Sequence, residues 1–209
     1  MGIAERKERE REERRRVIID AAEKIFFEKS FDVATMQDIA DHCELSKGTL
    51  YLYFKTKNEL CLAIYSRSLT LLQQMFEKSI DEHISVENRI KDIVSCFHKF
   101  IKDYPALYQA ILNFHQHSTN CSESADIITT CGHQKERISN LIVQMIESGK
   151  LSGEISAETD SQEVANLLWN DKTGILSCAK LIDKNGIDQN AFDSVNYFIK
   201  ILLQAISKK

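Results

Sequence analysis

The stretch S-K-G-T-L-Y-L-Y-F-K-T-K-N-E-L, at residues 46–60, is the most informative part of the chain. It holds three lysines and two tyrosines, with no acidic residue before Glu59, although the whole 209-residue chain has a net charge of −4. An acidic protein can bind nucleic acid only through a local basic patch. Residues 46–60 are the candidate for that patch.

Capping residues predict two helices within this stretch. Ser46 is a suitable N-cap for a short helix that runs to about residue 54. Thr56 and Glu59 have the spacing of a capping box, and apolar residues continue that helix to about residue 75.

A further short helix precedes the stretch. Thr35 can cap it, with Asp38 at the capping-box distance, and a tight turn at 44–46 follows. Two short helices joined by a tight turn, the second beginning with small and basic residues, are typical of a helix-turn-helix. We therefore predict a DNA-binding unit here.

The residues at the start of the second short helix suit entry into a DNA major groove. Lys47, Gly48 and Thr49 are small or able to form hydrogen bonds. A glycine lowers helix propensity by about 1 kcal/mol relative to alanine, so Gly48 indicates a close approach to another molecule.

Phosphate contacts are expected from the residues that follow. Tyr51 and Tyr53 carry hydroxyls, and Lys57 lies at a helix start, where backbone N–H groups already favour an anion. Such contacts supply affinity but little sequence information. Each of these side chains could instead be an ordinary core aromatic or surface lysine.

Three segments resemble the DNA-binding region of TetR/AcrR-family transcriptional repressors: R-x-x-I-x-x-A-A-x-x-I-F at 15–26, T-M-Q-D-I-A-D at 35–41, and the stretch at 46–60. The resemblance covers about residues 15–65. It implies that Leu50, Leu52 and Phe54 are structural. It also implies that the DNA-facing residues are Thr35, Lys47, Gly48, Thr49, Tyr51, Tyr53 and Lys57.

Two positions depart from the family pattern. The family usually has glycine at the ends of the first two helices, where this chain has Ser30 and Glu44. If those positions need a positive φ, a residue with a Cβ is disfavoured. Either the turns are strained or a different cap is used, and Glu44 adds a negative charge near the recognition helix.

The N-terminal charge run, A-E-R-K-E-R-E-R-E-E-R-R-R at 4–16, has two interpretations. It predicts either a solvated helical extension with ion pairs four residues apart, or an arm whose residues Arg14 to Arg16 touch DNA. The first structured helix is expected over about 17–28.

Seven glycines and one proline leave few helix breakers, so we predict an all-α fold of about nine helices. Gly149 is expected to stop one helix in a C′ role, and Gly153 to form a turn. The predicted domains are a charged extension at 1–14, a three-helix helix-turn-helix domain at 15–60, and a C-terminal helical bundle at 61–209. Further helices are predicted at 86–101, 105–115, 127–148, 160–182 and 191–206.

The resemblance implies that residues 61–209 bind a small-molecule effector and form a homodimer. The last two long helices, about 160–183 and 188–207, would form the dimer, and a strip of Gly174, Ser177 and Cys178 permits close helix contact. A two-fold dimer suits a palindromic double-stranded DNA operator. The effector would release the repressor from that operator.

Apolar and aromatic residues on the middle helices could line a pocket for a hydrophobic or aromatic effector, although each alone is more simply a core residue. Gln109, Asn113, Asn166 or Asn170 could orient that ligand. The candidate ligand residues are Phe97, Phe100, Ile101, Tyr104, Tyr108, Ile111, Phe114, Met145 and Trp169.

A cluster of possible soft ligands suggests an alternative regulator that senses metal or thiol chemistry. His115, His117, Cys121, Cys131 and His133 lie within nineteen positions, in a spacing that matches no familiar zinc motif. They could equally be incidental residues of a polar loop.

Other functions have weaker sequence support. No nucleophile-elbow, zincin, dinucleotide or P-loop motif is present, so we expect no enzyme and no cofactor. An alternative hypothesis is a helical interaction protein that kept the fold but lost DNA binding, and Glu44 supports it. We expect no membrane-spanning helix and no signal peptide, and hence a cytoplasmic protein with reduced thiols.

Overall fold

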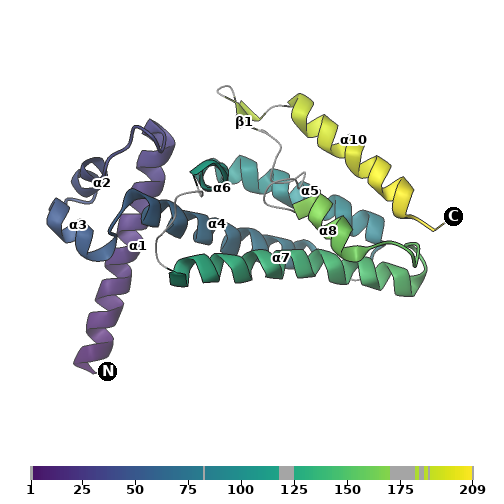
Figure 1. Cartoon of the computed structure of the whole chain (residues 1–209), viewed down its shortest axis with the longest axis horizontal. Helices are drawn as coiled ribbons and strands as arrows, with labels where there is room; N and C mark the ends of the chain where they lie inside the picture. The colour runs from purple at the N-terminus through teal and green to yellow at the C-terminus, as the bar shows by residue number, and fades with distance from the viewer. Residues whose placement is uncertain are drawn as a thin grey trace. The chain divides into compact units, whose positions relative to one another are not determined.

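The computed structural model describes residues 2–81, 83–117, 125–169, 182–183, 186–187 and 189–208 (Figure 1). The described residues form nine helices and one hairpin with two residues in each strand, so the predicted all-α fold is confirmed. The chain divides into two compact units. One contains residues 1–68 and 106–129, and the other contains 69–105 and 130–209.

The first unit contains α1, α2, α3, the beginning of α4, and α6. A stripe on α1, including Ile18, Ala22 and Phe26, is buried, as the helical spacing predicts. The bounds are α1 (Ile3–Lys29), α2 (Met36–His42), α3 (Lys47–Tyr53), α4 (Lys57–Ser79) and α6 (Pro105–His117).

The N-terminal charge run is helical and, apart from the half-buried Arg15, exposed. It continues α1 beyond α2 and α3 (Figure 1), and Arg6 pairs with Glu10 at 2.8 Å, one turn further on. This is the solvated helical extension of the first interpretation.

α2 ends in a Schellman motif whose C′ residue is Glu44. The Leu45 N–H donates to the Ala40 carbonyl at 2.9 Å, and the Glu44 N–H donates to the Asp41 carbonyl at 3.2 Å. Glu44 has a φ of 55°, in the left-handed region that favours glycine. Of the two possibilities open at this position, the strained turn is therefore the observed one.

Ser30, at the end of α1, is strained in the same way. Its φ of 66° and ψ of 156° lie in a region used almost only by glycine. Both positions where the chain departs from the family pattern therefore keep a glycine-like backbone without a glycine.

The second unit contains the end of α4, then α5 (Val86–Asp103), α7 (Ala125–Ser152), α8 (Ser161–Trp169) and α10 (Gln189–Ile206), with the hairpin β1 (Ile182–Asp183) and β2 (Gly186–Ile187). Buried aromatic rings meet in its core. The Trp169 ring lies edge-on to Phe76 and Phe97, with ring centroids 6.2 and 6.4 Å apart.

Gly149 does not end α7, so its predicted C′ role is wrong. It lies inside the helix, where an added Cβ would come within 2.6 Å of Val86 Cγ2 and 2.7 Å of Ile155 Cγ1. Gly153, with a φ of 80°, is the C′ residue instead. The Glu154 N–H closes that turn on the Gly149 carbonyl at 2.9 Å.

Some sequence predictions fall outside the described residues. Of the helix predicted at 160–182, α8 is described as far as Trp169, and the strip of Gly174, Ser177 and Cys178 lies beyond it, as does Asn170. The functional boundaries at residues 14 and 60 stay predictions. None of the described helices combines the length and apolar character needed to cross a membrane.

Candidate nucleic-acid interface

The beginning of α3 presents the predicted groove-facing residues at the surface. Ser46 caps the helix by accepting from the Thr49 N–H at 3.0 Å, and its hydroxyl lies 2.8 Å from that of Thr49. Lys47 and Gly48 are exposed, and the Lys47 ammonium has no partner among the described residues. A free cation therefore lies at the helix end that would meet DNA first.

Gly48 is not required by the packing of the protein itself. A Cβ built at this position would meet one atom, Ser46 Oγ at 3.8 Å, which is ordinary van der Waals contact. Because the fold has room for a methyl group here, the missing side chain is consistent with close approach by an external molecule.

The two tyrosines of α3 have hydroxyls without hydrogen-bond partners among the described residues. Tyr51 is exposed and Tyr53 is half-buried. The Tyr53 carbonyl accepts from Arg15 Nη1 at 3.3 Å, and the Arg15 guanidinium lies 4.2 Å from the centre of the buried Phe54 ring. Arg15 thus joins α1 to the end of α3, a structural role without a local sequence signal, because its partner is 38 residues away.

One residue expected to be structural is not. Leu52 is 73% exposed, whereas Leu50 and Phe54 are buried as expected. Helical periodicity explains the difference, because positions 50 and 54 are four residues apart and lie on one face, whereas position 52 lies on another. Leu52 is therefore an apolar side chain on the exposed face of α3.

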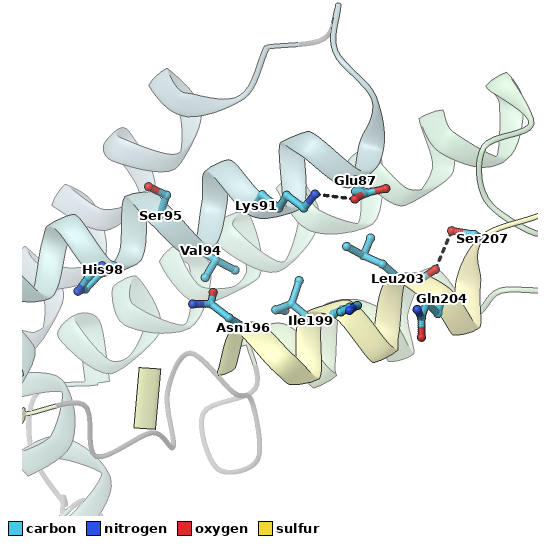
Figure 2. Close-up of a pocket in the computed structure, with 11 residues that line it drawn as sticks. Glu87, Lys91, Val94, Ser95, His98, Asn196, Ile199, Leu203, Gln204 and Ser207 are labelled. Carbon is cyan, nitrogen blue, oxygen red and sulfur yellow. Dashed lines mark hydrogen bonds and ion pairs between the residues drawn. The ribbon is translucent and has the colours of Figure 1, made fainter. Parts of the chain in front are cut away.

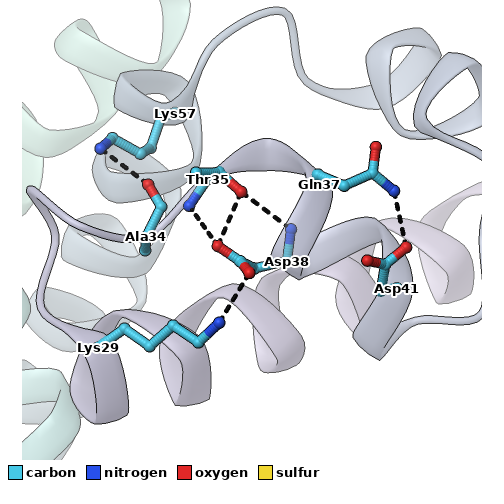
Figure 3. Close-up of polar contacts among 7 residues, drawn as sticks. All are labelled: Lys29, Ala34, Thr35, Gln37, Asp38, Asp41 and Lys57. Atoms are coloured by element: carbon cyan, nitrogen blue, oxygen red, sulfur yellow. Dashed lines mark hydrogen bonds and ion pairs between the residues drawn. The ribbon is translucent and has the colours of Figure 1, made fainter.

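Thr35 forms the predicted capping box of α2 (Figure 3). Its hydroxyl accepts from the Asp38 N–H at 3.1 Å and lies 2.7 Å from Asp38 Oδ2, to which it donates. Lys29 Nζ reaches the other oxygen at 2.7 Å. Bonds from Lys29 and then Thr35 lower the pKa of Asp38 to about 2. The hydroxyl proton of Thr35 is thus already donated within the protein.

Lys57 has all three of its donors engaged. Its ammonium donates to the carbonyls of Phe31 at 2.6 Å, Ala34 at 3.0 Å and Asp32 at 3.2 Å, and lies 4.5 Å from the Phe31 ring centre. Figure 3 shows the side chain reaching Ala34. The lysine therefore ties the start of α4 to the loop between α1 and α2, a role that its sequence neighbours do not reveal.

A capping residue also orders the start of α4. The Glu59 N–H donates to Thr56 Oγ1 at 3.1 Å, as predicted, and the Glu59 carboxylate accepts from the Lys55 N–H at 2.5 Å. The one acidic residue of the 46–60 stretch is thereby held against backbone. The Glu44 carboxylate, in contrast, is exposed and has no partner among the described residues.

Most of the predicted ligand residues are packed in the cores of the two units. Tyr104 is exposed and Phe114 is half-buried, with its ring stacked 4.0 Å from that of Tyr65. The buried members in the second unit are Phe97, Phe100, Ile101, Met145 and Trp169. Those in the first unit are Tyr108 and Ile111.

Two clefts lie among the described residues of the second unit. One, of about 900 Å³, lies between α5 and α10, with Val94, Ile199 and Leu203 among its lining residues and the Lys91–Glu87 ion pair at its edge (Figure 2). The other, of about 560 Å³, is lined by Ile80, His83, Ile84, Ser85 and Arg89 and by residues of α7, among them Met145 from the predicted ligand set.

The predicted His/Cys cluster is only partly described. Cys121 and the side chains of His115 and His117 lie outside the described residues. On α7, Cys131 is buried while His133, two positions further, is exposed. Within the described part of the chain, no three His, Cys, Asp or Glu residues could together hold a metal ion.

Comparison with protein families identifies the N-terminal region. Residues 18–64 match the family described as bacterial regulatory proteins, tetR family. The matched range contains α2, α3 and most of the residues of the interface described above.

Individual relatives are transcriptional regulators. The transcriptional activator FasR of Mycolicibacterium smegmatis is 31% identical over 101 residues, which span 48% of this chain and 46% of FasR. The uncharacterized regulator YfiR of Bacillus subtilis is 23% identical over 95% of this chain and 96% of its own. The fold also resembles FadR of Bacillus subtilis in complex with stearoyl-CoA, with a TM-score of 0.68, 18% identity, and coverage of 91% and 98% of the two chains.

Proposed function

Because this chain is a TetR-family transcriptional regulator with a helix-turn-helix DNA-binding domain, we propose that it acts as a homodimeric repressor. It binds a palindromic double-stranded DNA operator and leaves it when a small effector binds the C-terminal bundle. The observation that carries the proposal is the exposed start of α3, where Lys47, like the hydroxyls of the two tyrosines that follow in the same helix, has no partner among the described residues.

The DNA contacts divide into two kinds under this proposal. Lys47, Gly48 and Thr49 approach base edges in the major groove, and Tyr51 and Tyr53 reach phosphates. Thr35 and Lys57 support the interface indirectly, since their polar groups hold the loop before α2 in place. Thr35 keeps a lone pair and Lys57 a positive charge, so both stay candidates for weaker contacts.

Fluorescence anisotropy with DNA from upstream of the protein's own gene tests this proposal. Tight binding should weaken steeply as salt is raised, because phosphate contacts release counterions. Lys47→Ala should weaken binding while leaving the unfolding curve unchanged. Binding that is absent at low salt would reject DNA recognition and favour an interaction protein that keeps the fold alone.

Exposed apolar residues on the last described helices support the homodimer. Tyr197 on α10 is 67% exposed, Ile201 lies one turn further on the same face, and Leu167 on α8 is also exposed. A row of large apolar side chains at the surface is typical of a protein interface. Two-fold symmetry would place two copies of α3 about one DNA turn apart, roughly 34–36 Å.

The effector is proposed to be small and at least partly hydrophobic. FadR of Bacillus subtilis, which shares the fold, is in complex with stearoyl-CoA. The second unit of this chain offers two clefts of suitable size for a small molecule. Effector binding that favours one dimer arrangement over another by a few kcal/mol is enough to release DNA.

No catalytic role is proposed, because the matched relatives are transcriptional regulators. A regulator that binds bacterial DNA works in the cytoplasm, and this is the compartment we propose. Metal analysis of untagged protein would detect a metal-dependent regulator, which no described group of residues supports.

A further inference from the structure

Arg89, in the first turn of α5, is a buried cation with no carboxylate partner among the described residues. It is 6% exposed, and its one partner among the described residues is Ser148 Oγ, 2.9 Å from Nη1. Its Nε is fully shielded from solvent and has no hydrogen-bond partner there. A buried guanidinium with five donors and one neutral acceptor is unfavourable unless an anion completes it.

The guanidinium lines a cleft. The cleft of about 560 Å³ in the second unit has Arg89 and Ser148 in its wall, with Gln144 exposed on α7. Four apolar residues also line it: Ile80, Ile84, Leu141 and Met145. Such a wall suits a molecule with one acidic group and an apolar remainder.

Among the described residues, the other charged and titratable groups that line the cleft form no hydrogen bond or ion pair with Arg89. The Glu154 carboxylate accepts from the Val86 N–H and from Ser152 Oγ, both at 2.9 Å, so both of its oxygens are engaged elsewhere. His83 is exposed. The Ser148 hydroxyl donates to the Met145 carbonyl at 2.8 Å and offers Arg89 a lone pair but no charge.

We propose that this cleft binds the acidic group, carboxylate or phosphate, of a small amphipathic molecule, with Arg89 as the anion-binding residue. A guanidinium binds a carboxylate or phosphate through short, charge-assisted hydrogen bonds from its terminal N–H groups. The proposal rests on the proposed function in one respect, since it names the chemical class of the effector. The binding site itself does not depend on DNA release.

The cleft between α5 and α10 has no comparable buried cation in its described lining. Its Lys91 is exposed and pairs with Glu87, and none of its lining residues has a shielded polar atom without a partner among the described residues. Arg89 therefore distinguishes the smaller cleft.

Thermal unfolding of the full chain with three probes tests the site. Octanoate, octyl phosphate and 1-octanol share a tail and differ in the head group. Binding to the folded state raises the unfolding temperature. We expect octanoate, octyl phosphate or both to raise it more than 1-octanol does, and the stronger of the two identifies the acid. An equal shift from 1-octanol, or no shift from any probe at millimolar concentration, would overturn the proposal.

Arg89→Met is the matched variant, because it keeps an unbranched side chain and removes the charge. Replacing a buried unpaired charge by an apolar side chain is often neutral or stabilising. The affinity for the acid should fall about tenfold or more in this variant. Ser148→Ala should fold and still bind acid. Should Arg89→Met retain the full acid-dependent shift, the guanidinium is only structural.

A separate measurement distinguishes the two proposals. If acid binds through Arg89 but does not release DNA in the anisotropy assay, the anion site stands and the effector part of the proposed function fails. If acid neither binds nor shifts the unfolding temperature while DNA binding persists, only the anion site fails.

Discussion

Single residues separate into those that the fold needs and those that it does not. Gly149 is needed, because Val86 and Ile155 leave no room for a Cβ. Gly48 is not needed by packing, and the hydroxyls of Tyr51 and Tyr53 bond to none of the residues that the structure describes. Residues that do not contribute to the stability of the fold are the ones that remain available to bind a partner.

Gly48→Ala should therefore separate stability from DNA binding. The free energy of unfolding should stay unchanged or rise by up to about 1 kcal/mol, since alanine is the better helix former. DNA affinity should fall, because the methyl group faces the proposed groove surface. Urea unfolding and anisotropy measure the two quantities.

Gly149→Ala serves as the opposite control. Its Cβ would meet side chains at 2.6 and 2.7 Å, so overpacking should lower the free energy of unfolding by about 1–3 kcal/mol. If Gly48→Ala destabilised the protein as much as Gly149→Ala, Gly48 would have a structural role.

Glu44→Gly should stabilise the protein by about 1 kcal/mol, because glycine adopts a φ of 55° without strain. It should also strengthen DNA binding at low salt by removing an exposed carboxylate near α3. Glu44→Asn removes the charge while keeping a residue that tolerates this backbone, so it should share the gain in affinity.

Ser30→Gly tests strain without a change of charge. We expect a gain in stability at least as large as that of Glu44→Gly, because its φ and ψ lie in the region reserved almost entirely for glycine. DNA affinity should stay near that of the wild type. A loss of stability in both glycine variants would contradict the strained turns.

At the scale of helices and loops, capping residues order the interface. Thr35, Ser46 and Thr56 each begin a helix, and their signals are local in sequence, so all three starts could be predicted. Lys57 could not be read in the same way, because its carbonyl partners are 23 to 26 residues away. The C′ role predicted for Gly149 is wrong for a similar reason, because a side chain that leaves no room for a Cβ there belongs to Val86, far upstream.

The capping box of α2 should weaken in acid. The folded-state pKa of Asp38 is lowered from 3.8 to about 2, so the ionised side chain contributes stability above the higher value. That contribution is lost as the pH falls through the lower one. Asp38→Asn should be less stable than the wild type at neutral pH, with a difference that shrinks between the two pKa values. Urea unfolding across that window checks the trend, and a constant difference would contradict it.

Lys57→Met and Tyr53→Phe should behave differently. Lys57→Met leaves three carbonyls of the loop before α2 without their donor, so the free energy of unfolding should fall by about 1–3 kcal/mol and DNA affinity should fall with it. Tyr53→Phe removes a hydroxyl with no partner in the described part of the chain and should weaken DNA binding alone. Equal unfolding curves for Lys57→Met and the wild type would reject the structural role of the lysine.

At the scale of the whole molecule, the family pattern predicts more about the first unit than about the second. The first unit is specified by short motifs with fixed spacing, at residues 15–26, 35–41 and 46–60. In the second, the candidate ligand residues turn out mostly to be core, because aromatic residues at helical spacing pack a bundle whether or not a cavity exists. The proposed role of Arg89 could not be predicted from a motif, because it depends on the burial of the side chain and on the hydrogen-bond partners it lacks among the described residues.

The proposed dimer gives a prediction at this scale. Tyr197→Glu with Ile201→Glu places two charges on the exposed apolar face of α10 and should produce a monomer. Operator affinity should fall by orders of magnitude, because the two half-sites are then bound independently. Light scattering and anisotropy measure both effects. Lys200→Ala is the control on the same helix, and a dimer that survives the double substitution would place the interface elsewhere.

The three carbonyls around Lys57 also have a consequence for amine chemistry. The Lys57 ammonium donates to three carbonyls and is held against the loop before α2, where an electrophile reaches it poorly, whereas the Lys47 ammonium has no partner among the described residues. A limited dose of an acylating reagent should label Lys47 early and Lys57 late. The order of labelling, read by mass spectrometry, would then report whether the loop between α1 and α2 is intact, and bound DNA would protect Lys47 alone.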